Sequence, residues 1–85
     1  MLLPMAKPSL SHAGHPDLVA LGTVIRALRA INGHSQESFA DEVGIDRSYM
    51  GGIERGEHNL ALVNLLKISK ALKMPASKLL EKAKI

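Results

Sequence analysis

Residues 36–55 read QESFADEVGIDRSYMGGIER, and this stretch decides the fold. Two short helices that cross steeply need a small residue where they touch, and Ala40 supplies one. The turn between them needs a residue that accepts positive φ at little cost, and Gly44 follows four positions later. The positions expected to face inward are all apolar: Phe39, Val43, Ile45, Met50 and Ile53. The stretch therefore predicts two helices packed closely across a tight turn.

Capping residues mark the ends of both helices. Ser35 can cap the first helix, and Gly44 can end it. Asp46 can cap the second helix, which we expect to run to about Arg55, and Gly56 follows it. Together the caps, the turn and the apolar positions predict a helix-turn-helix motif.

Three further helices are expected on either side of this motif. The segment from Asp17 to the Asn32-Gly33 stop carries apolar residues at helical spacing, and so do residues 62–72 and 76–82. No segment alternates apolar and polar residues long enough to form a strand. The sequence predicts an all-α domain of five short helices over residues 17–85, preceded by a flexible arm over residues 1–16.

Composition excludes several classes of function. The 85 residues are 46% hydrophobic with a net charge of +3, which is typical of one globular domain. Cysteine is absent, and His12 and His15 have no expected third ligand, so we predict no metal site and no cofactor. No glycine-framed nucleophile or phosphate-binding loop is present, so we expect no enzyme. No apolar run is long enough for a membrane span, and we expect a cytoplasmic protein.

The positive charge is distributed unevenly along the chain. Residues 35–60 carry two basic and six acidic residues, whereas residues 61–85 carry six basic and one acidic residue. The motif itself is therefore acidic, and we expect electrostatic affinity for an anionic partner to be modest for each monomer.

Residues 21–72, LGTVIRALRAINGHSQESFADEVGIDRSYMGGIERGEHNLALVNLLKISKAL, resemble the phage-repressor (Cro-like, Xre-type) helix-turn-helix DNA-binding domains. Within that family, residues 45–60 look most like restriction–modification controller proteins. The resemblance implies a compact five-helix, lambda-repressor-like domain that binds double-stranded DNA as a dimer. Two positions depart from the family pattern: Ala61 stands where a capping Ser or Thr is usual, and Lys73 where a helix-ending glycine is usual.

The resemblance also implies roles for individual residues. It assigns base readout to Arg47 and Ser48 in the first turn of the recognition helix, and to Gly51 and Gly52 on its outward side. Because glycines have no side chain to read bases with, we expect few direct base contacts beyond Arg47 and Ser48. The expected phosphate contacts are Gln36, Tyr49, Arg55, His58 and Asn59.

Two structural roles follow from the same resemblance. Arg29 and Glu54 match a family salt bridge between the first helix and the recognition helix. The C-terminal region forms the dimer interface in the family, and the apolar residues expected there are Leu72, Met74, Leu79 and Leu80.

These features predict a sequence-specific, homodimeric transcriptional regulator acting on a pseudo-palindromic operator. It would repress where it blocks RNA polymerase and activate where it touches the polymerase. Two alternatives remain open: an antitoxin or adaptor whose helix-turn-helix scaffold mainly binds a protein, and a nonspecific nucleoid-type DNA binder.

Overall fold

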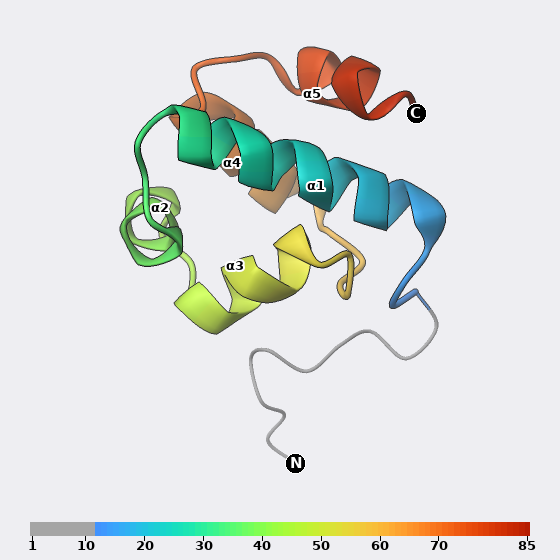
Figure 1. The fold of residues 1–85 in the computed structure, drawn as a ribbon, viewed down its shortest axis with the longest axis horizontal. Coiled ribbons are helices and arrows are strands. Elements are labelled where there is room, and N and C mark those ends of the chain that lie inside the picture. Colours follow the sequence, from blue (N-terminus) through green and yellow to red (C-terminus); the bar gives the residue numbers. More distant parts are fainter. Residues whose placement is uncertain (1–11) are drawn as a thin grey trace.

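The computed structural model describes residues 12–85, and in this range the chain forms five helices and no strand (Figure 1). The helices are α1 (Pro16–Ile31), α2 (Gln36–Val43), α3 (Arg47–Glu54), α4 (Leu62–Ala71) and α5 (Ala76–Ala83). The predicted all-α, five-helix fold is confirmed. Of the predicted arm, residues 1–11 lie outside the described residues.

Local sequence explains where the motif helices begin and end. The Ser35 side chain accepts from the Ser38 N–H at 3.0 Å, and the Asp46 carboxylate accepts from the Ser48 N–H at 3.0 Å. Gly44 ends α2 with φ of 87°. By contrast, α4 and α5 begin without a side-chain cap.

The core lies where α1 crosses the other helices. α1 packs against α3 on one side and α5 on the other, so α3 and α5 lie at opposite ends of the molecule (Figure 1). The largest fully buried side chains come from all five helices: Ile25, Phe39, Met50, Ile68 and Leu79. This shared core fixes the orientation of α3, which carries the predicted recognition surface.

Close contact between α1 and the end of α3 depends on two glycines: Gly22, which was not predicted to have a role, and Gly56, which was predicted only to follow the second motif helix. A Cβ atom at Gly22 would lie 2.6 Å from the carbonyl oxygen of Glu54. A Cβ atom at Gly56, which has φ of 75°, would lie 2.7 Å from Val19. Any larger residue at either position would push α1 away from α3.

Residues 12–16, which were predicted to belong to the arm, are part of the folded unit. The Gly14 N–H donates to the Gly56 carbonyl at 2.9 Å, and Pro16 is the first residue of α1. The His15 imidazole accepts from the Asp17 N–H and caps the helix. The boundary at residue 16 is therefore corrected, because this turn is hydrogen-bonded to the loop after α3.

The predicted dimer residues lie mostly in the core. Leu72 and Leu79 are 5% and 0% exposed, and Met74 and Leu80 pack half-buried against the same cluster. They are needed inside the monomer because α4 and α5 close the core over α1. The exposed apolar side chains of α4 are different ones: Leu62, Val63 and Leu66.

Candidate nucleic-acid interface

The helix-turn-helix is built from α2, a turn at Gly44 and Ile45, and α3. Both turn residues donate their N–H groups to the Ala40 carbonyl, at 2.8 and 3.0 Å. The small side chain of Ala40 is buried in the core, as the predicted contact between the helices requires. Figure 1 shows α3 lying below α1, with α2 beside its first residues.

The first turn of α3 presents two exposed polar side chains, Arg47 and Ser48. The Asp46 carboxylate accepts hydrogen bonds from both the hydroxyl and the N–H of Ser48, and these bonds lower the pKa of Asp46. Because the Ser48 hydroxyl donates to Asp46, its oxygen remains available to accept a hydrogen bond.

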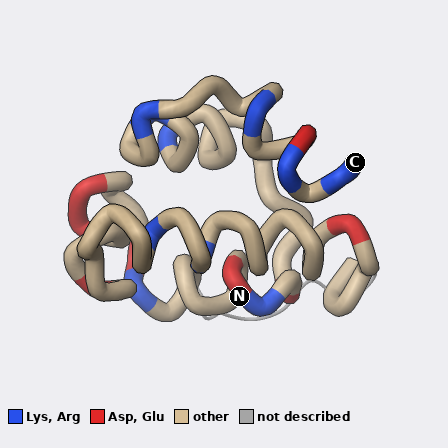
Figure 2. The backbone as a smooth tube through the Cα atoms, turned by 45° about the horizontal axis from the view of Figure 1, so that its top comes forward, with Lys and Arg blue, Asp and Glu red and all other residues tan. Residues whose placement is uncertain are grey.

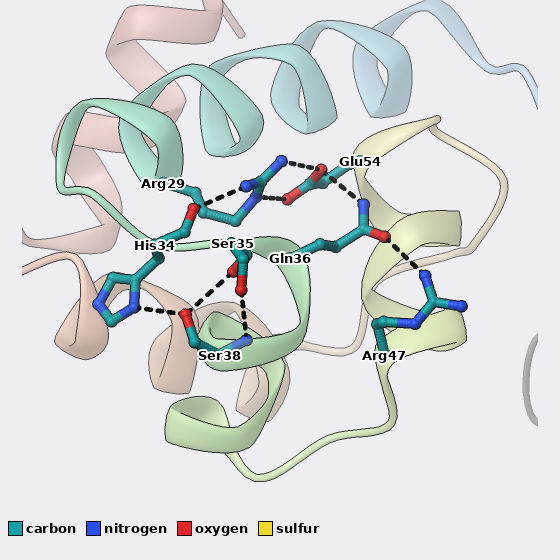
Figure 3. A network of polar contacts seen from close by, with 7 residues as sticks. All are labelled: Arg29, His34, Ser35, Gln36, Ser38, Arg47 and Glu54. Atoms are coloured by element: carbon teal, nitrogen blue, oxygen red, sulfur yellow. Dashed lines mark hydrogen bonds and ion pairs between the residues drawn. The ribbon is translucent and has the colours of Figure 1, made fainter.

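A polar network connects α1, α2 and α3 beneath this surface (Figure 3). Arg29 donates to Glu54 through Nε at 2.6 Å and through Nη2 at 3.2 Å. The Gln36 amide then donates to Glu54 Oε1 at 3.0 Å and accepts from Arg47 Nη1 at 3.3 Å. The Glu54 side chain is only 3% exposed. The network therefore links the exposed Arg47 to a buried ion pair through a single glutamine.

The two consecutive glycines of α3 are buried and do not face outward, which corrects their predicted position. A methyl group at Gly52 would overlap the imidazole of His58. A Cβ atom at Gly51 would lie 3.0 Å from Arg55 Nη1 and 3.3 Å from Gln36 Oε1. Each glycine leaves room for a side chain that folds back over the helix, so neither offers a free edge to a DNA base.

His58 occupies the space beside Gly52 and is only 6% exposed, so it does not line the DNA-facing surface as predicted. Its ring centroid lies 4.6 Å from that of Tyr49, and its buried Nε2 atom has no hydrogen-bond partner among the described residues. Burial lowers the pKa of His58. Because its pKa is lowered, the imidazole packs as a neutral ring. It occupies the space that a side chain at Gly52 would fill.

The remaining predicted phosphate contacts differ in their accessibility. Arg55 and Asn59 are exposed, and Gln36 and Tyr49 are half-buried. Arg55 Nε donates to Glu57 Oε2 at 2.8 Å, and this hydrogen bond lowers the pKa of Glu57. The Tyr49 hydroxyl accepts from Asn64 Nδ2 at 3.3 Å. The structure thus places Gln36 beside Arg47 and leaves Arg55 and Asn59 in the loop after α3.

Other kinds of site receive no support from the described residues. In residues 12–85, no three His, Asp or Glu side chains come together as metal ligands. Within the same range, no helix has both the length and the apolar character that a membrane span requires.

Comparisons with known proteins point in the same direction as this geometry. The helix-turn-helix family model HTH_3 matches residues 25–79. The chain is 43% identical over 56 residues to the control protein C.SmaI of Serratia marcescens, covering 66% of this chain and 67% of that protein. It is 51% identical over 45 residues to the control protein C.MunI of a Mycoplasma species, covering 53% of this chain and 61% of that protein.

A solved structure with the same fold covers most of the chain. The restriction–modification controller protein C.AhdI of Aeromonas hydrophila superposes with a TM-score of 0.74 and 48% sequence identity. The match covers 76% of this chain and 98% of that one. The similarity therefore includes the whole helix-turn-helix and the helices that support it.

Proposed function

The chain belongs to the HTH_3 helix-turn-helix family and is a DNA-binding transcription regulator, and we propose that it acts as a homodimeric controller protein on a pseudo-palindromic operator. The controller role comes from the named relatives, which include restriction–modification controllers. We infer that it binds duplex DNA in the cytoplasm and that it has no catalytic activity of its own. It represses where it blocks RNA polymerase and activates where it touches the polymerase.

The observation that carries the proposal is the anchored position of Arg47 at the exposed start of α3. Gln36 holds its guanidinium, and Gln36 is in turn held by Glu54. An anchored side chain loses less conformational entropy when it binds than a free one does. Arg47 is therefore suited to donate two hydrogen bonds to O6 and N7 of a guanine in the major groove.

Ser48 complements Arg47 in base recognition. Its hydroxyl hydrogen points to Asp46, so its oxygen accepts from the amino group of a cytosine or an adenine. Gly51 and Gly52 are covered by other side chains, and base readout therefore falls to Arg47 and Ser48. Gln36, Arg55 and Asn59 serve as phosphate contacts, which set affinity and register more than sequence preference.

The exposed apolar residues of α4 are suited to form a two-fold dimer contact. Leu62, Val63 and Leu66 are 67%, 63% and 49% exposed, and they lie within five residues of one another. A self-complementary apolar patch of this kind is typical of a C2 interface. Dimerisation would set two α3 helices about 34 Å apart, one turn of B-DNA, which explains why the operator would be pseudo-palindromic.

A binding titration tests the proposal. Wild type, Arg47→Ala and the control Lys82→Ala on α5 are titrated against an operator selected from random DNA and against scrambled DNA. Loss of Arg47 should relax the preference at one symmetric base-pair position by about 1–3 kcal/mol. Lys82→Ala should retain the preference of the wild type.

Two results would contradict the proposal and favour the alternatives. Equal affinity of the wild type for both DNAs would indicate a nonspecific binder. A tight stoichiometric complex with a protein, without salt-sensitive DNA binding, would indicate an adaptor or antitoxin module.

A further inference from the structure

An open pocket lies between α1, the start of α2 and the end of α3, next to the proposed reading surface. Its lining combines three guanidinium groups with one carboxylate: Arg26, Arg29, Gln36, Gly51, Glu54 and Arg55. Arg26 received no role from the sequence, where it is only one polar position on the first helix. The pocket therefore brings an unassigned arginine beside two residues of the proposed phosphate surface.

The charges of the pocket do not cancel. Glu54 is already satisfied, because both of its oxygens accept from Arg29 and one also accepts from Gln36. Arg55 is paired with Glu57 outside the pocket. Arg26 forms no ion pair within residues 12–85 and is exposed. An anion entering the pocket would therefore meet one uncompensated guanidinium and a second one held by a single exchangeable partner.

Gly51 lines this pocket, and it has no side chain between its neighbours Gln36 and Arg55. The Cβ of any other residue would press on Arg55 Nη1 at 3.0 Å and on Gln36 Oε1 at 3.3 Å. Without a side chain at this position, Gln36 and Arg55 can approach each other over α3. The glycine thus allows two phosphate-binding side chains to share one site.

We propose that this pocket binds one phosphodiester of the DNA backbone, with Arg26 as a direct ligand and with Arg55 turning from Glu57 to the phosphate. This inference rests on the proposed DNA-binding function and adds Arg26 and Glu57 to it. The same Gln36 that lines the pocket also contacts Arg47, so the bound phosphate and the base-reading side chain share a neighbour. Phosphate binding here would fix the register of α3 in the groove.

Salt-dependent DNA binding tests the role of Arg26. Arg26→Gln should weaken binding to the selected operator and to scrambled DNA by the same factor. It should also reduce the slope of log K against log salt by about one per protomer. Lys82→Gln on α5, at the opposite end of the molecule from α3, is the matched control and should leave the slope unchanged (Figure 1). A wild-type slope in Arg26→Gln would overturn the assignment.

Glu57→Gln tests the partner exchange of Arg55 and predicts a change of the opposite sign. Removing this carboxylate frees Arg55 and takes a negative charge away from the backbone, so both DNAs should bind more tightly. Unchanged or weaker binding would exclude the exchange. If inorganic phosphate saturates the pocket, shown by shifts of the Gly51 amide signal, while Arg26→Gln leaves DNA binding unchanged, the site takes a small anion and the DNA assignment is overturned.

These results separate the inference from the proposed function. If the wild type fails to bind DNA, the proposed function fails. If the wild type binds and discriminates while Arg26→Gln behaves like wild type, only the phosphate assignment fails.

Discussion

The buried imidazole of His58 makes the stability of the protein depend on pH. Burial lowers its pKa below the ordinary value of 6.5, so the unfolded chain binds this proton more readily than the folded chain. With respect to His58, the free energy of unfolding should therefore be constant above about pH 6.5 and should fall as the pH drops below this value. Glu57 raises and Arg55 lowers the pKa of the ring by their charges, against the larger effect of burial, and Tyr49 is the aromatic group packed on it.

Denaturant unfolding between pH 7 and pH 5 measures this dependence. The variant His58→Gln lacks the titrating ring and should show a smaller slope over that range. An equal slope in both proteins would show that another group is responsible.

The Arg29–Glu54 pair is the most buried ion pair among residues 12–85. Its side chains are 13% and 3% exposed, so Arg29→Met would leave a buried carboxylate without its cation. We expect a loss of about 3–5 kcal/mol in the free energy of unfolding. The exposed pair Lys78–Glu81 is the control, and Lys78→Met should cost less than about 1 kcal/mol. A similarly small loss for Arg29→Met would contradict the importance given to this pair.

Unlike the motif helices α2 and α3, α4 begins without a side-chain cap. Its N-cap residue is Ala61, whose backbone is extended as a cap requires but whose side chain offers no acceptor. Ala61→Ser should therefore stabilise the protein by about 1 kcal/mol. Ala27→Ser, at an exposed position inside α1, is the control and should be slightly destabilising. Thermal unfolding of both variants measures these changes in stability. A capping effect is excluded if Ala61→Ser is not more stable than the wild type.

The motif helices could be predicted closely because their limits are local. Ser35, Gly44 and Asp46 act through their own backbone neighbours, so their roles can be inferred from the chain alone. Gly22 was missed, and Gly56 was predicted only as the residue after the helix, because the packing role of both is a close approach between distant segments. The available signal for Gly22 was a glycine four residues after Leu18, on the apolar face of the predicted helix.

In the candidate site, too, the sequence predicted what local residues determine and missed what distant contacts determine. Arg47 and Ser48 are exposed in the first turn after the cap, where the sequence placed them, and their role in base readout stays a prediction. The burial of Gly51 and Gly52 was not, because it depends on Arg55 and His58 folding back from the next loop. Helical position alone fixes which direction a residue faces, but it does not fix what covers that face.

At the scale of the whole molecule, positive and negative charges gather on different helices. Lysines gather on α4 and α5, while six of the eight acidic residues lie on α2 or on and beside α3 (Figure 2). Because α5 and α3 lie at opposite ends of the molecule, the lysines of α5 cannot share a groove with the recognition helix (Figure 1). The +3 charge therefore contributes less to DNA affinity than its value implies, and the arginines near α3 contribute more.

The apolar surface of α4 gives a prediction for assembly. Leu66→Lys should convert the dimer to a monomer, since it buries a charge in the proposed interface at no cost to the monomer core. Ile31→Lys, at a 76% exposed position at the end of α1, is the control and should remain dimeric. Sedimentation velocity distinguishes the two states. A dimeric Leu66→Lys protein would contradict the proposed interface.

A footprint of the wild-type protein on its selected operator tests most directly whether it is a dimeric, sequence-specific regulator. We predict two protected half-sites related by two-fold symmetry, with centres about 10 base pairs apart, as expected for two α3 helices in successive major grooves. Protection spread evenly along the DNA, or a single half-site without a symmetric partner, would contradict this function.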